Sequence, residues 1–134
     1  MSLVGTVDQA EEKAAAKGLA CILPKPSELF IDIDDNASAD RFEKAFDILK
    51  GNNRYELRVV RSTPSQSGDP YRFHIVVDLG RPVINEVERI ALQAILGSDP
   101  AREALSWMHL QQGTTNVSRF FEKPQPIKFE SEPF

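Results

Sequence analysis

Hydrophobic and polar residues alternate along several short segments of the chain, a pattern typical of strands with two different faces. The predicted strands are residues 28–34, 55–61, 71–79 and 117–122. Between them, apolar residues recur at helical spacing and indicate amphipathic helices. The predicted helices are residues 39–50, 84–96 and 100–110. The first of these has Ser38 as its expected cap, and the second has an apolar stripe formed by Val87, Ile90, Ala91, Ala94 and Ile95.

The order of these elements is that of the ferredoxin-like or RRM-like βαββαβ arrangement, with one extra helix before the last strand. We therefore predict an α+β fold with an antiparallel sheet covered by helices on one face. In this arrangement the first and third predicted strands are central neighbours. Because side chains alternate along a strand, the aliphatic rows of both strands should face the helices. Asp32, Asp34 and His74 should then share the opposite, solvent-facing surface.

The 134 residues are enough for one domain with a real core. We predict a partly helical N-terminal arm over residues 1–27, the ferredoxin-like domain over 28–122, and a proline-rich tail over 123–134. The single cysteine, Cys21, excludes an intramolecular disulfide. No apolar run approaches the length of a membrane span and the N-terminus lacks the order of a signal peptide. The expectation is a cytoplasmic protein without a membrane partner.

The formal net charge of −4 gives no general attraction for a phosphate backbone. A nucleic-acid partner would therefore need a local basic surface or a bridging metal ion. Asp32 and Asp34 lie two residues apart, so their carboxylates share one strand face and repel each other. A divalent cation would relieve this repulsion, and hard oxygen ligands suit Mg²⁺ or Mn²⁺. Asp99 is a candidate third acid, although a simple N-cap before Pro100 also explains it.

His74 and Arg72 are predicted on the strand beside Asp32. The imidazole could contact a nucleotide phosphate, a metal-bound carboxylate or the metal itself. Arg72 and Arg58 could neutralise phosphate charge, or they could simply form cross-strand ion pairs with carboxylates such as Asp78 or Glu56.

The connection before this strand carries Ser65 and Ser67, which are candidates for phosphate contact. A flexible hairpin connection explains the same serine- and glycine-containing segment. The alternative for Asp34 is a solvated strand end that begins a turn and a helix cap.

These residues resemble the signatures of the archaeo-eukaryotic primase (primase-polymerase) superfamily, in a small phage or prophage protein. The segment 29–34, Leu-Phe-Ile-Asp-Ile-Asp, is similar to its apolar strand ending in D-x-D, and Arg72-Phe73-His74 is similar to its histidine motif. Arg72 stands where the family has a small hydroxyl residue, and Ser98-Asp99 only approximates the third motif. The likeness covers residues 28–122, and the chain lacks room for the additional module of full-size primases.

The resemblance implies an RRM-like sheet whose carboxylates bind divalent ions. It also implies an activity that transfers a nucleotide to a 3′-hydroxyl. Asp32, Asp34 and His74 would be the catalytic residues. The expected function is a small primase-polymerase-like domain that binds metal and nucleotide or nucleic acid, in a reduced or inactive form. If active, it would be a metal-dependent nucleotidyltransferase.

The alternative is a non-enzymatic ferredoxin-like interaction module of a phage or prophage, with a second copy or a phage protein as its partner. A replication-initiator nuclease is a weaker third reading, because neither His74 nor His109 forms the paired histidines that it needs.

Overall fold

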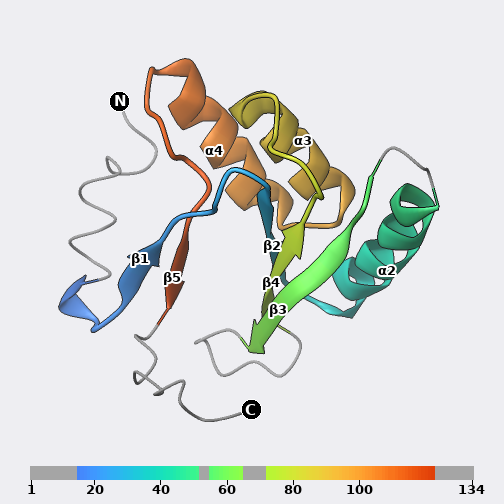
Figure 1. Ribbon diagram of the computed structural model, residues 1–134. Helices are drawn as coiled ribbons and strands as arrows, with labels where there is room; N and C mark the ends of the chain where they lie inside the picture. Colours follow the sequence, from blue (N-terminus) through green and yellow to red (C-terminus); the bar gives the residue numbers. More distant parts are fainter. Residues whose placement is uncertain (1–14, 52–54, 65–71, 123–134) are drawn as a thin grey trace, which may run out of the picture.

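The computed structural model describes residues 15–51, 55–64 and 72–122 (Figure 1). Its elements, in chain order, are β1 (Ala20–Ile22), β2 (Glu28–Ile33), α2 (Asn36–Lys50), β3 (Arg58–Pro64), β4 (Phe73–Asp78), α3 (Glu86–Ile95), α4 (Pro100–Gln111) and β5 (Phe120–Glu122). Within the described residues, three helices and two antiparallel sheets form a small α+β fold consistent with the ferredoxin-like class, so this prediction is confirmed. No helix in these ranges is long and apolar enough to cross a membrane.

The main sheet has the strand order β2-β4-β3, and both pairings are antiparallel. The expected pairing of the first and third predicted strands is therefore confirmed, with Asp32 directly opposite His74. Helices α2 and α3 cover one face of this sheet through Phe42, Leu92 and Leu96, the last being the C-cap residue of α3. The sheet side chains in this core are aliphatic: Leu29, Ile31, Ile33 and Val77.

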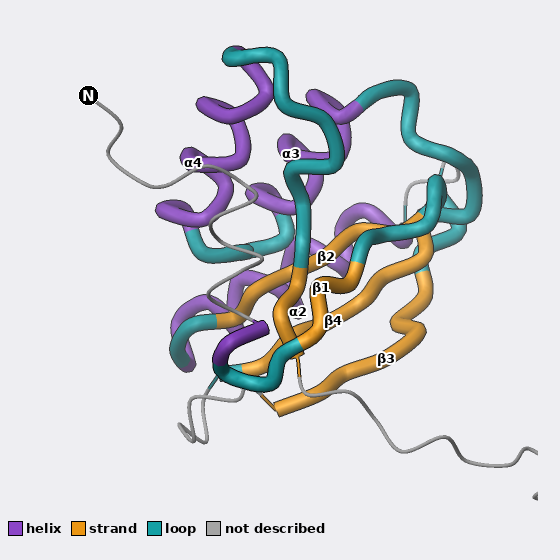
Figure 2. Tube along the Cα trace, turned by 90° about the vertical axis from the view of Figure 1, so that its left-hand side faces the viewer, coloured by secondary structure: helices purple, strands orange, loops and turns teal. Residues whose placement is uncertain are grey.

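The opposite face of the main sheet is also covered, so the prediction of a solvent-facing surface is wrong there. Strands β1 and β5 pair with each other and lie beside the main sheet on the side away from α2 (Figures 1 and 2). Phe120 of β5 packs on Phe30 and Val76, with Ile22 at the margin of this second core. Part of the expected N-terminal arm thus belongs to the fold, and the domain extends to the N-terminal side of Glu28. The predicted tail, residues 123–134, lies outside the described residues.

Strand β5 does not extend the main sheet because the outer edge of β2 already has partners. An edge accepts another strand only through unpaired backbone groups. Here the N–H groups of Phe30 and Asp32 donate to Gln93 Oε1 (2.7 Å) and Ser98 Oγ (2.9 Å). The carbonyl groups of the same edge accept from Arg102 Nη1, Asp99 N and Arg89 Nε, at 2.9, 2.8 and 2.9 Å. Side chains from α3, α4 and their connection therefore take the place of a fourth strand.

This edge also explains why the predicted apolar stripe of α3 is wrong. Of that stripe, Ile90 is buried, whereas Val87 and Ile95 are 43% and 55% exposed. The buried face instead carries Arg89 and Gln93 among aliphatic side chains, because these polar groups reach the backbone of β2. Hydrophobic periodicity cannot detect a helix face that is buried through hydrogen bonds.

Helix α2 begins three residues earlier than expected. Asp35 is its N-cap, since its Oδ1 accepts from the N–H of Ser38 at 2.8 Å. Ser38, the predicted cap, lies inside the helix, and its side chain is buried where the chain leaving α3 passes close by.

We expect Gly97→Ala to lower the free energy of unfolding by about 2–3 kcal/mol, because a left-handed backbone and a close approach both exclude a side chain there. Gly97 has a φ of +89°, and a Cβ would lie 2.9 Å from the backbone oxygen of Ser38. Gly113 is the matched control: its φ is +90° but nothing lies within 4 Å. Gly113→Ala should cost about 1 kcal/mol, from backbone conformation alone. Urea denaturation measures the unfolding free energy of both variants. Equal losses would show that the close contact between residue 97 and the backbone of α2 does not exclude a side chain.

Candidate functional site

Asp32 and His74 lie side by side between the two sheets. Their side chains share the face of the main sheet turned toward β5, and Asp32 Oδ1 is 3.8 Å from His74 Nε2. Both line a pocket of about 250 Å³. The other residues around this pocket are Arg102, Arg119, Phe120 and Phe121. A carboxylate, an imidazole and two guanidinium groups therefore surround one small cavity.

His74 is held in place by Glu122, a residue that sequence reasoning did not select. Its Nδ1 lies 2.8 Å from Glu122 Oε2, and Arg61 Nη1 donates to the other carboxylate oxygen at 2.9 Å. Glu122 is only 2% exposed. A carboxylate on Nδ1 fixes the orientation of an imidazole and directs its Nε2 to the other side. In this fold Nε2 is consequently directed toward Asp32 and the pocket.

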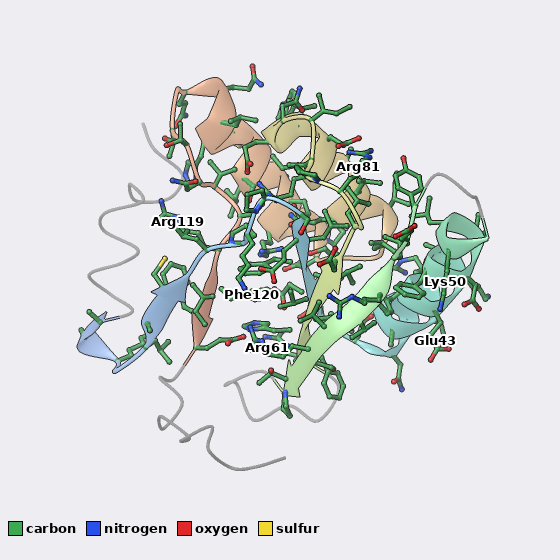
Figure 3. All side chains as sticks on the ribbon, in the orientation of Figure 1. Glu43, Lys50, Arg61, Arg81, Arg119 and Phe120 are labelled. Carbon is green, nitrogen blue, oxygen red and sulfur yellow. The ribbon has the colours of Figure 1, made fainter. Side chains whose placement is uncertain are left out.

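A β-bulge brings Arg61 to this cluster. Val59 lies opposite Val77, but Arg61 rather than Val60 lies opposite Val76, so the register shifts by one residue. A bulge reverses the faces of all the side chains that follow it. Regular alternation would have placed Arg61 on the helix-covered face. With the bulge, its guanidinium lies between the sheets, near β5 (Figure 3).

Phe120 belongs to the second core and also lines the pocket. Its ring is parallel to that of Phe30, at 4.3 Å between centroids, and to that of His74, at 4.0 Å. The rings of Phe30 and His74 cannot both stack on the same face of the Phe120 ring. Phe120 is therefore sandwiched between them. The guanidinium carbon of Arg102 lies 5.0 Å from the centre of the same ring. These contacts hold the imidazole in a single orientation, with Phe120 at the centre of the cluster (Figure 3).

Burial raises the pKa of the Asp32 carboxyl above its ordinary value, and the negative charges of Asp99 and Asp34 act in the same direction. Arg102 and His74 oppose this rise in the pKa without cancelling it. Ionised Asp32 therefore lowers the stability of the folded chain at neutral pH, and added positive charge would be favourable here.

We expect Asp32→Asn to raise the unfolding free energy at pH 7, because asparagine resembles the protonated acid. The gain should shrink as the pH falls through the raised pKa, and it should vanish below the ordinary value of 3.8. Urea denaturation across this pH range measures the difference. Asp47→Asn, at an exposed position of α2, is the control and should follow the wild type throughout. A variant that is less stable than the wild type at pH 7 would show that Asp32 is stabilised as the anion.

The other predicted site residues are only partly gathered here. Asp34 pairs with Arg72 across the end of the strands, at 3.0 Å, and both side chains are more than 40% exposed. Arg58 begins β3 opposite the last residue of β4, Asp78, and pairs with it at 3.6 Å, which is the ion-pair alternative foreseen for Arg58. The two serines predicted to contact phosphate, Ser65 and Ser67, lie outside the described residues.

Asp99 caps α4, as its alternative explanation requires: its Oδ1 accepts from the N–H of Ala101 at 3.1 Å. Its own N–H donates to the backbone oxygen of Asp32, so it also lies near the pocket. In the described part of the chain, no group of three or more His, Cys, Asp or Glu side chains could hold a metal ion. Mg²⁺ often binds one or two carboxylates and completes its coordination with water and substrate phosphates. Asp32 lines the pocket, whereas Asp34 lies at its margin in an ion pair with Arg72.

No family model, curated protein or solved structure matches the chain. The pocket geometry and the sequence signatures around it are therefore the features that bear on function.

Proposed function

We propose that the chain is a small primase-polymerase-like domain that binds a divalent cation, Mg²⁺ or Mn²⁺, together with a nucleotide or nucleic-acid phosphate. One observation carries the proposal: the aspartate and histidine of two separate sequence signatures, Asp32 and His74, lie opposite each other on paired strands and line one pocket. Arg102 and Arg119 line the same pocket, and guanidinium groups suit phosphate oxygens. Asp32, His74 and Arg119 provide local recognition that the acidic chain as a whole lacks, while Arg102, which is hydrogen-bonded to Glu103, Ser98 and backbone oxygens, adds positive charge to the pocket wall.

Each residue has a defined role in this proposal. Asp32, with the neighbouring Asp34, would hold the cation, and the raised pKa of Asp32 marks a place where added positive charge is favourable. His74 Nε2 would face the bound phosphate, with the orientation of the ring set by Glu122. Arg119 would meet the phosphate charge. The bound cation would neutralise phosphate charge and activate a 3′-hydroxyl for nucleotidyl transfer. The unusual Arg72, already paired with Asp34, is consistent with a reduced or inactive relative.

Calorimetry with Mn²⁺ and a nucleoside triphosphate tests the proposal. We expect wild type to bind the nucleotide in a metal-dependent manner, and Asp32→Asn to weaken this binding at least tenfold. Asp47→Asn, the exposed control on α2, should bind like the wild type. If wild type shows no metal-dependent binding, or if both variants bind equally well, the site is not the one proposed. A 3′-extension assay with labelled nucleotide then distinguishes an active enzyme from a reduced one.

A non-enzymatic interaction module is the second candidate, and exposed apolar side chains favour it. Ile84 is 78% exposed before α3, and Ile95 is 55% exposed near its end. Val87, which is 43% exposed, and the exposed Ala91 lie between them at helical spacing, so these residues share one side of α3. Contiguous exposed apolar residues mark contact surfaces. Analytical ultracentrifugation of wild type and Ile95→Lys tests self-association through this side. The interaction-module hypothesis is supported if the wild type dimerises, Ile95→Lys does not, and neither protein binds nucleotide.

A further inference from the structure

A second pocket adjoins the first one and differs from it in character. It has a volume of about 300 Å³ and lies between α4 and the chain that leads into β5. Its apolar side chains are Leu105, Val117 and Phe121. This volume and largely apolar lining are typical of the lower end of small-molecule sites. Polar side chains, Asp99 and His109, also border it.

The two pockets share three lining residues: Arg102, Arg119 and Phe121. Arg119 lies on the chain just before β5, and its Nε donates to the backbone oxygen of Asn116 at 2.7 Å. Both terminal nitrogens of Arg102 donate hydrogen bonds, to Ser98, Glu103 and backbone carbonyls, so this side chain is a fixed part of the boundary. One surface thus runs from a charged pocket, across two arginines, to an apolar pocket.

We propose that these adjoining pockets are the phosphate and base subsites of a single nucleoside phosphate site. The inference rests on the proposed function, and it adds where the base binds. A nucleoside phosphate is anionic at one end and flat and largely apolar at the other, which matches this sequence of pockets. The phosphates lie near His74, Asp32 and Arg119, and the base lies in the pocket against Leu105 and Phe121. Asp99 and His109 provide hydrogen-bonding groups for the polar edge of the base.

Filling the second pocket from α4 tests this assignment without removing any core side chain. Ala101 is exposed and lines the pocket, so Ala101→Trp places a large ring there. Ala104→Trp is the matched control, because Ala104 is exposed on the same helix but does not line either pocket. Calorimetry in Mg²⁺ compares a nucleoside triphosphate with inorganic triphosphate. We expect Ala101→Trp to weaken nucleoside triphosphate binding at least tenfold and to change the affinity for inorganic triphosphate by less than twofold. Ala104→Trp should change neither affinity.

Methyl NMR of the wild type supplies an independent readout. A nucleoside without phosphate should shift the resonances of Leu105 and Val117, whereas inorganic triphosphate with Mg²⁺ should shift the imidazole signals of His74. If both triphosphates bind but Ala101→Trp has no effect and the methyl signals stay still, the base subsite is wrong and the proposed function stands. If inorganic triphosphate fails to bind while the nucleoside shifts the methyl signals, the base subsite stands and the phosphate site is wrong. If no probe produces any change, both are overturned.

Discussion

Replacing Arg102 with methionine is expected to lower the free energy of unfolding by about 3–5 kcal/mol, the range for removing one partner of a buried ion pair. Arg102 Nη1 contacts Glu103 Oε2 at 2.6 Å, and Glu103 is only 3% exposed. The same guanidinium donates to Ser98 Oγ and to the backbone oxygen of Phe30, so its loss also leaves part of the β2 edge without a partner. One side chain therefore joins α4 to the sheet and neutralises a buried carboxylate.

The pH dependence of this loss identifies its cause. Burial already raises the pKa of Glu103, and Arg102 opposes that rise. Without Arg102 the pKa should rise further, so protonation at lower pH should recover part of the lost stability. Urea denaturation between pH 7 and acid pH measures this recovery. Arg58→Met is the control, since Arg58 is 72% exposed in its ion pair and its loss should cost about 0.5 kcal/mol or less. A pH-independent loss would show that packing, not charge, is responsible.

Glu122→Ala is expected to cost a similar amount, about 3–5 kcal/mol, and to disturb the site as well. The carboxylate is buried and is the common partner of Arg61 and His74. Its removal leaves the half-buried guanidinium of Arg61 without its carboxylate and removes the partner that orients the imidazole. Glu122→Gln keeps the size but lacks the charge, so we expect a smaller loss of about 1–3 kcal/mol.

Double-mutant cycles separate this interaction from general damage to β5. If Arg61 and Glu122 act together, the losses from Arg61→Met and Glu122→Gln should not add in the double variant. Phosphate binding gives a second readout: Glu122→Gln should weaken triphosphate binding through His74, whereas Thr63→Val, which removes the other partner of Arg61, should not. Additive losses of unfolding free energy, together with unchanged triphosphate binding, would show that Glu122 has only a local structural role.

The pairing of β2 with β4 could be predicted from the sequence because alternation and element order are local patterns with few compatible topologies. The same local patterns predict that Asp32 lies beside His74, and the strand register confirms this prediction. The sequence also contains a signal for the burial of Phe120 and Glu122, because these residues lie two apart in a predicted strand and share a face. Because they lie at the end of the strand, alternation there is too short to show which face is buried.

Other features depend on tertiary contacts that leave no periodic pattern. The bulge at Val60 moves Arg61 to the site face, and no turn residue in the sequence marks it. The outer edge of β2 is covered by polar side chains such as Gln93, which hydrophobic periodicity treats as solvent-facing. With that edge occupied, β5 pairs with β1, a three-residue strand too short to be distinguished from a loop by composition.

Paramagnetic broadening by Mn²⁺ tests the central claim, that Asp32 and His74 mark a cation and phosphate site, most directly. Amide NMR spectra of the chain would be recorded with a nucleoside triphosphate and substoichiometric Mn²⁺. The proposed site predicts that the signals of Asp32 and His74 broaden first, while that of Ile48, exposed on α2, stays sharp. Broadening centred on another part of the chain, or none at all, would contradict it.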